Sequence, residues 1–325
     1  MAPAMRELGS PCAAAVFPGQ APLFALADGT IHRWDRAESV RAHPALLSVA
    51  CSGNALLTAG EDGRVCRTGD GEGPVELAAL PRKWIDCVAA GPGGALAFAA
   101  GRSAWLVHAD GGRRELKQAR SVAGLRYLPD GSGLALARYD GIALYAVAGD
   151  APPQELDWKG IYTGLDVSPD GRFLLAFMQD GLLHGWRLPS ARAPARHFRM
   201  TGYASRIRAW SWSADGRRLA TAGAPTAVVW PFDGEDGPIG RRAEEVGEPR
   251  EDVAVTAVAF RPDGEALAIG YADGAVLLGA MGEAPARRLR APDGAAVNAV
   301  AWHNSGAALA YGTGTGACGV LDVPG

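Results

Sequence analysis

Short apolar runs of about five residues alternate with turn segments along the whole chain. The runs at 255–260 (VTAVAF) and 297–302 (VNAVAW) are typical examples. They are rich in Val, Ala and aromatic residues, and Gly, Pro, Asp and Asn bound many of them, which favours β-strands over helices. Many of these strands are apolar on both faces, as is typical of sheets that are covered on both sides. The pattern therefore predicts an all-β protein of packed sheets.

A turn signal recurs between these runs at a spacing of about 40 residues. It reads Pro-Asp-Gly at 129–131, 169–171 and 262–264, and Ala-Asp-Gly at 214–216. Proline presets φ and glycine tolerates positive φ, so the motif favours a tight turn between two strands. A repeat of this length indicates a chain built by copying one supersecondary unit.

Eight such units fill the chain when the residues before each turn are aligned. Each has three apolar runs, and the units before the last add a shorter, more polar fourth run. Such a run suits an outer edge strand because polar edges discourage edge-to-edge pairing. The units lie near 11–44, 45–81, 82–119, 120–158, 159–204, 205–253, 254–294 and 295–323.

The last unit ends directly after its third run, whereas residues 4–9, before the first unit, supply a spare one (Met5-Arg6-Glu7-Leu8). We predict that this N-terminal strand completes the last sheet. One ring of repeats buries one continuous set of cores, so a single domain over residues 1–325 is expected.

The second unit carries the most specific sequence marks. Ala42-His43, Thr58 and Asp62-Gly63 stand in order, and the first unit contains Trp34-Asp35. These positions resemble the Gly-His, Ser/Thr, turn Asp and Trp-Asp of the WD40 repeat family. The resemblance spans roughly residues 5–323 and implies a β-propeller of four-stranded antiparallel blades. It also implies a structural role for His43, Thr58 and Asp62. The repeat count gives eight blades, and seven, the usual number in that family, is the alternative.

Composition and charge narrow the classes of function. A net charge of −3 and a pI near 6.1 differ from the strongly basic charge that is typical of nucleic-acid-binding domains. No apolar run approaches the length of a membrane-spanning helix, and the N-terminus lacks the apolar centre of a signal peptide. The five cysteines are odd in number and lack CxxC spacing, which favours reduced thiols. We therefore expect a cytoplasmic protein that binds neither nucleic acid nor membranes.

Candidate catalytic groups are sparse. Propeller enzymes usually place metal ligands or acid–base groups on first strands, but here those positions are mostly Ala, Ser or Gly. Arg126 and Asp166 hold the same position in adjacent units, so we expect an ion pair between neighbouring sheets. The six histidines share no spacing that suggests a metal site. We expect no catalytic residue, metal or cofactor. A propeller enzyme or small-ligand binder that uses the central channel stays as the alternative.

Aromatic and basic residues gather at the starts of the first runs and at the turns after the second runs. Such residues supply most hot spots of protein interfaces, and the WD40 resemblance implies that this face binds partners. The residues predicted to bind are Trp84, Tyr139, Lys159, Tyr162, Tyr203, Arg206 and Arg208. We expect a non-catalytic scaffold for protein–protein interaction, with an acidic peptide or loop as the complementary partner.

One charged segment, 231–252, interrupts the repeat spacing and is rich in Gly and Pro. It is either a solvated loop around a fourth strand or a loop that binds a partner.

Overall fold

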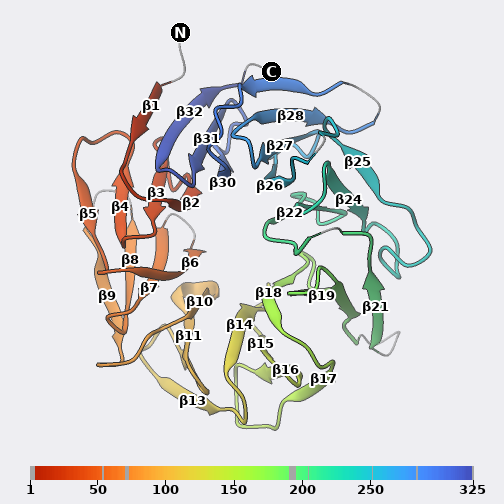
Figure 1. The fold of residues 1–325 in the computed structure, drawn as a ribbon. Coiled ribbons are helices and arrows are strands. Elements are labelled where there is room, and N and C mark those ends of the chain that lie inside the picture. The colour runs from red at the N-terminus through yellow and green to blue at the C-terminus, as the bar shows by residue number, and fades with distance from the viewer. Residues whose placement is uncertain are drawn as a thin grey trace. The chain divides into compact units, whose positions relative to one another are not determined.

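The computed structural model describes residues 4–52, 55–69, 73–189, 195–203, 205–250, 252–282 and 285–323. Within these residues, 32 strands form eight four-stranded antiparallel sheets, and the helical structure is a single 3₁₀ turn, η1 (Pro92–Gly94). The fold is an all-β propeller of eight blades (Figure 1). The predicted fold class and the count of eight are confirmed, and the alternative of seven blades is wrong.

The repeated turn motif forms the hairpins as expected. In 262–264, Gly264 has a φ of +77°, a region that glycine enters at no steric cost. The carboxylate of Asp263 accepts the backbone N–H of Glu265 at 3.0 Å, which holds the turn closed. The two strands on either side of this turn pair antiparallel, with Phe260 opposite Leu267.

The chain divides into two compact units, each with a set of four sheets. One unit comprises the described parts of Val40–Thr201 with Asp28–Thr30. Its sheets are β6 (Leu46–Ser52), β7 (Ala55–Gly60), β8 (Arg64–Gly69), β9 (Val75–Ala79); β10 (Cys87–Ala90), β11 (Leu96–Ala100), β12 (Ser103–Val107), β13 (Arg113–Lys117); β14 (Val122–Tyr127), β15 (Gly133–Arg138), β16 (Gly141–Ala146), β17 (Gln154–Asp157); and β18 (Tyr162–Val167), β19 (Phe173–Met178), β20 (Leu183–Arg187), β21 (Arg196–Met200).

The other unit comprises the described parts of Met1–Ala27, Ile31–Ser39 and Gly202–Gly325. It holds all or most of the sheets β2 (Cys12–Val16), β3 (Leu23–Leu26), β4 (Thr30–Arg33), β5 (Ser39–Arg41); β22 (Trp210–Trp212), β23 (Arg218–Thr221), β24 (Ala227–Pro231), β25 (Glu244–Val246); β26 (Val255–Phe260), β27 (Ala266–Tyr271), β28 (Val276–Ala280), β29 (Arg287–Arg290); and β30 (Val297–Trp302), β31 (Ala308–Thr313), β32 (Ala317–Asp322), β1 (Ala4–Glu7). The single-domain organisation over residues 1–325 stays a prediction.

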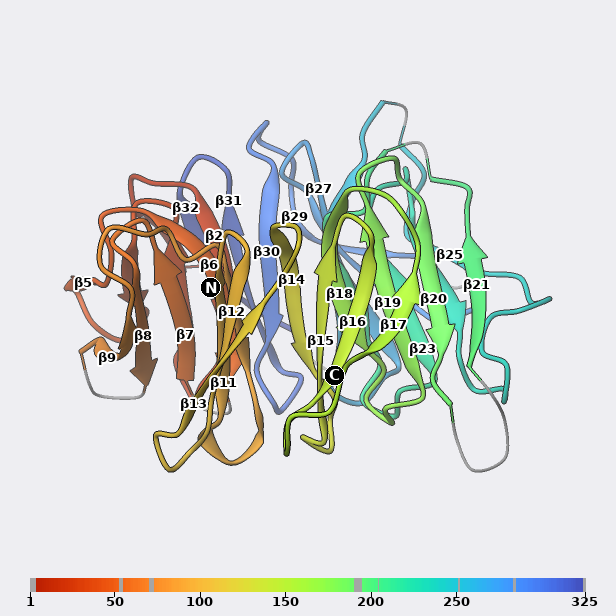
Figure 2. The same cartoon turned by 90° about the horizontal axis from the view of Figure 1, so that it is seen from below.

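Within each unit the first strands of successive sheets pack against one another. β6, β10, β14 and β18 follow in this order in one unit, and β22, β26, β30 and β2 in the other. Figure 2 shows strands of the first-named unit, such as β14, β15, β18 and β19, along their length. The apolar cores lie between neighbouring sheets, as where Leu136 of β15 and Leu106 of β12 share one buried cluster. Burial on both faces explains why the sequence runs are continuously apolar.

The N-terminal strand completes the last sheet, as predicted. β1 pairs antiparallel with β32, with Met5 opposite Gly319 and Glu7 opposite Ala317. The backbone N–H of Leu8 extends the pairing to the carbonyl of Gly316 at 2.9 Å. The first residues of the chain thus cover the edge that the last strand would expose.

The charged segment 231–252 contains a fourth strand. β25 pairs with β24 through Val246 opposite Ala227, so the described part of the segment is a long connection around an outer strand. Across the described residues, no helix has the length and apolar character needed to cross a membrane.

Candidate functional site

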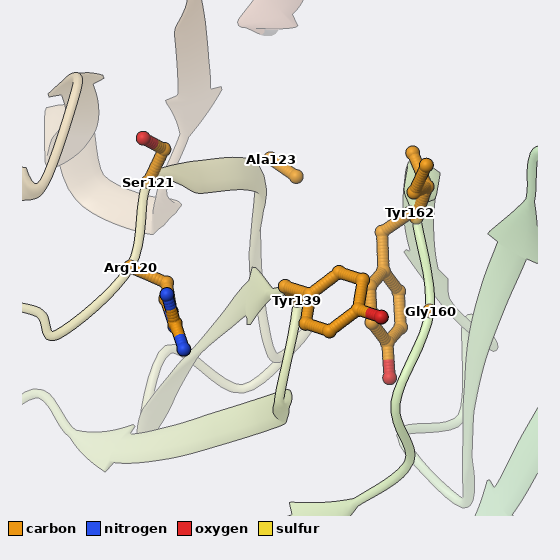
Figure 3. A pocket seen from close by; sticks show the side chains of 7 residues that line it. Arg120, Ser121, Ala123, Tyr139, Gly160 and Tyr162 are labelled. Carbon is orange, nitrogen blue, oxygen red and sulfur yellow. The ribbon is translucent and has the colours of Figure 1, made fainter.

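A pocket of about 450 Å³ opens where the loop before β14 faces the loop before β18. Its lining comes from Arg120, Ser121, Ala123, Tyr139, Gly160, Ile161 and Tyr162. Figure 3 shows Arg120 and Ser121 on one side and Gly160 and Tyr162 on the other, with Tyr139 between them in that view. The pocket therefore brings together two of the residues predicted from the sequence, Tyr139 and Tyr162.

Hydrogen bonds between backbones fix the loops that form the pocket. The N–H of Gly160 donates to the carbonyl of Tyr139 at 3.0 Å, and the N–H of Gln179 donates to the carbonyl of Ile161 at 2.9 Å. Gly160 also lies tight against Met178, whose Cε would be 2.3 Å from an added Cβ. Such fixed loops on a sheet scaffold present side chains in one arrangement.

Both first strands that border the pocket have a register shift near their start. The pairing of β14 with β15 shifts register between Val122 and Gly124, and that of β18 with β19 shifts between Tyr162 and Gly164. A bulge bends its strand and re-orients neighbouring side chains. Beside the shift, Tyr162 points inward and is only 4% exposed, whereas Ile161 is 55% exposed.

The phenol of Tyr162 ties the pocket to the loop before β18. Its hydroxyl donates to the backbone carbonyl of Trp158 at 2.6 Å, and burial raises the pKa of Tyr162. The indole of Trp158 stacks on the ring of His197, with the ring centroids 4.8 Å apart. It also packs against the ring of His184, where the ring centroids are 4.1 Å apart. These contacts hold the 158–161 segment, so Lys159 and Ile161 project from a fixed loop.

Two cations, Arg120 and Lys159, lie at or next to the pocket. Arg120 is the one charged residue among those that line the pocket, and its Nε is 3.6 Å from Oδ2 of Asp140. Lys159 is exposed on the adjoining loop. Exposed ion pairs at this separation contribute little, so a ligand carboxylate can compete for Arg120.

Large apolar side chains are exposed on loops of the same unit. Trp84, between β9 and β10, is 64% exposed and Tyr139 is 52% exposed. Leu47, at the start of β6, is also exposed. Arg82 and Lys83 precede Trp84 and are exposed as well. Exposed apolar groups beside cations are typical of interaction surfaces.

The residues predicted to have structural roles lie in two clusters. His43 Nε2 is 2.9 Å from Thr58 Oγ1, and His43 Nδ1 is 3.0 Å from Asp62 Oδ1. Burial alone would raise the pKa of Asp62, but hydrogen bonds from Arg64 and His43 outweigh it and lower that pKa. In the second cluster, Arg126 Nε is 2.8 Å from Asp166 Oδ1.

The remaining predicted residues belong to the unit that contains β22–β32. The hydroxyl of Tyr203 lies 2.6 Å from Thr221 Oγ1 and accepts the indole N–H of Trp230 at 2.6 Å. That hydroxyl is therefore hydrogen-bonded to two residues of the sheet β22–β25, and the role of Tyr203 toward a partner stays a prediction. Arg206 and Arg208 are exposed, consistent with a surface position.

Ile161 is a pocket residue that the sequence reasoning did not select. The available signal was alternation, because Tyr162 faces inward and its neighbour must then face outward. Among the described residues, no group of three or more His, Cys, Asp or Glu side chains is placed to hold a metal ion.

Two solved structures are similar to this chain over essentially their whole length. The C-terminal WD40 domain of Sif2 superposes with a TM-score of 0.74 at 14% identity and covers 100% of both chains. The computationally designed Ika8 protein gives a TM-score of 0.73 at 18% identity and 98% coverage of each chain. No family model and no curated protein matches the sequence. Likeness at these identities concerns the fold: the chain has the fold of a WD40 domain, built here from eight blades.

Proposed function

We propose that this protein is a non-catalytic scaffold that binds a partner protein through the loops around the pocket of Tyr139, Ile161 and Tyr162. The observation that carries the proposal is the combination of an apolar pocket with exposed apolar side chains beside it. Tyr139 and Ile161 are each more than half exposed. Water contact with such groups is unfavourable, and their removal from water on binding stabilises a complex.

The chemistry of the partner follows from the charges on these loops. Arg120 lies at the pocket, and Lys159 adjoins it. An acidic peptide or loop complements these cations, and a large apolar side chain of that peptide fits the pocket between the two tyrosines. Charge complementarity of this kind mainly accelerates association and sets specificity, while the buried apolar anchor supplies affinity.

The proposal is tested by affinity purification from the source cells with quantitative mass spectrometry. The double variant Tyr139→Ser/Ile161→Ser removes exposed apolar surface at the pocket. The matched control, Val75→Ser/Leu77→Ser, removes exposed apolar surface from the outer strand β9. We expect proteins that the wild type captures to be lost with the pocket variant and kept with the control. Equal capture by all three proteins at equal thermal stability contradicts the proposal.

A second candidate is the binding of a small ligand in the same pocket, because its volume of about 450 Å³ lies within the range of ligand sites. Native mass spectrometry of protein purified from the source organism distinguishes the two. A small ligand appears as a mass increase that Tyr162→Ala removes, whereas a protein partner appears as a second polypeptide.

A further inference from the structure

The side chain of Arg6 joins the N-terminal strand to the sheet formed by β2–β5. Its Nη1 donates to the backbone carbonyl of Arg36 at 2.9 Å and lies 3.0 Å from Nε2 of His32. The guanidinium carbon is 4.5 Å from the ring centre of Trp34. Three contacts from one side chain therefore hold β1 to a neighbouring sheet.

These contacts fix the protonation state of His32. A guanidinium can only donate hydrogen bonds, so Nε2 of His32 must be the acceptor and carries no proton. Its Nδ1 is then the protonated nitrogen and donates to Ser39 Oγ at 2.8 Å. The imidazole is 2% exposed, so it is held as a neutral ring between one donor and one acceptor.

We propose that His32 is an acid-sensitive clasp, which holds β1 in place while neutral and releases it when protonated. A proton on Nε2 replaces the acceptor with a donor, so the hydrogen bond from Arg6 is lost. It also places two cationic groups about 3 Å apart, and the imidazolium is buried away from water.

Other charged groups near His32 do not offset this repulsion. Burial and the charge of Arg6, in that order, lower the pKa of His32 from its ordinary value of 6.5. Phe24 lies opposite His32 in the sheet and is uncharged. Asp35 is paired with Arg33 at 2.7 Å. The other charged residues of the adjoining segments are Glu7, Asp28, Arg36, Glu38 and Arg41, and none of them is among the causes that shift the pKa of His32.

The direction of the effect follows from this lowered pKa. The docked state disfavours the proton, so docking is at full strength above pH 6.5. It weakens as the pH falls below that value, by up to about tenfold in the docking equilibrium per pH unit. Release of β1 leaves the edge of β32 unpaired, and an open edge can accept another strand.

Hydrogen exchange followed by mass spectrometry tests the proposal on the full chain. Protection of the amides of residues 5–8 is compared at pH 7.5 and 5.5, corrected for intrinsic exchange, with residues 309–312 of β31 as the internal reference. In the wild type, β1 should lose several-fold more protection than β31 at the lower pH. In His32→Gln, whose amide stays neutral and can still accept from Arg6, the pH-dependent difference should disappear.

Arg6→Gln provides a second test if His32→Gln does not fold, because Arg6 lies at the surface and its substitution disturbs the core less. Without the guanidinium, β1 should be less protected at both pH values, and an NMR titration should show the pKa of His32 closer to 6.5 than in the wild type. Equal pH dependence of β1 and β31 in the wild type overturns the clasp. So does an NMR-measured pKa of His32 that is unchanged by Arg6→Gln.

Discussion

Arg126 and Asp166 form an ion pair between two neighbouring first strands, with Nε of Arg126 2.8 Å from Oδ1 of Asp166. The pair is asymmetric, because the side chain of Asp166 is 7% exposed and that of Arg126 is 50% exposed. Asp166 Oδ1 also accepts the backbone N–H of Val167 at 2.8 Å. Water can solvate the charge of Arg126 but hardly reaches that of Asp166. The charged state of Asp166 is therefore stabilised more by the ion pair than the charged state of Arg126 is.

This asymmetry predicts that Arg126→Gln costs more stability than Asp166→Asn. Removal of the arginine takes one paired cation from a buried carboxylate, and we expect a loss of about 1–2 kcal/mol. Removal of the aspartate charge leaves an arginine that water can solvate, and we expect a loss below about 1 kcal/mol. Urea unfolding of the two single variants and the double variant measures both costs and their coupling. Additive costs in the double variant contradict a direct pair.

The pairing of β1 with β32 predicts that Leu8→Pro lowers thermal stability. Proline has no N–H, and the N–H of Leu8 donates to the carbonyl of Gly316 at 2.9 Å. We expect the melting temperature to fall by about 3–5 °C in calorimetry, with a larger fall on deletion of residues 1–9. Leu8→Ala measures the loss of the side chain alone. Met5→Pro is the second control, because hydrogen-bonded pairs alternate along an antiparallel ladder and the N–H of Met5 therefore faces away from β32. Equal melting temperatures for Leu8→Pro and Leu8→Ala contradict a stabilising role for this pairing.

The His43–Asp62 contact predicts an acid-dependent stability term. The pKa of Asp62 is lowered in the folded protein from its ordinary value of 3.8, so its contribution is present above pH 3.8 and is lost as the pH falls through the folded value. Asp62→Asn should cost about 1–2 kcal/mol at pH 7 and progressively less toward pH 3. Denaturant unfolding across this range provides the measurement. A cost that stays constant with pH means that the carboxylate charge is not what stabilises the fold.

The repeat made the blades predictable from sequence, whereas the site depended on packing between repeats. Turn chemistry at 262–264 and the spare run at 4–9 are local features, so they led directly to hairpins and to β1. The pair of Arg126 and Asp166 followed from equivalent positions in adjacent units. Local turn signals and the spacing of the repeat were enough for these predictions.

The pocket could not be derived in the same way. Its lining residues come from two neighbouring sheets, and the repeat pattern does not show how their side chains pack together. The register shifts at the starts of β14 and β18 do not single it out, because the same shift occurs at the starts of β26 and β30. Tyr203 was selected as a partner-binding residue from its place in the repeat, and that role stays a prediction. Its hydrogen bonds to Thr221 and Trp230 could not be predicted from the sequence, because they join residues 18 and 27 positions apart.

The hydrogen bonds of Tyr203 predict that substitution of this residue lowers the stability of the fold and leaves partner binding unchanged. Tyr203→Phe removes the hydroxyl that accepts the indole N–H of Trp230 and contacts Thr221, and both groups lose a partner. We expect a cost of about 1–3 kcal/mol in urea unfolding and no change in partner affinity at temperatures where the variant is folded. Weakened binding by a fully folded Tyr203→Phe protein returns this residue to the interface.

Charge-reversal variants can show which of the two predicted groups of basic residues contacts the partner. Lys159 adjoins the pocket, whereas Arg206 and Arg208 are exposed in the other unit. If an acidic segment binds at the pocket, Lys159→Glu should weaken affinity about five- to tenfold, with a smaller dependence on salt concentration than the wild type. Arg206→Glu/Arg208→Glu should change affinity less than twofold. Binding of a captured partner, measured by calorimetry at two salt concentrations, decides between them. A loss confined to the Arg206/Arg208 variant moves the interface to that surface, because neither charge lies among the residues of the pocket.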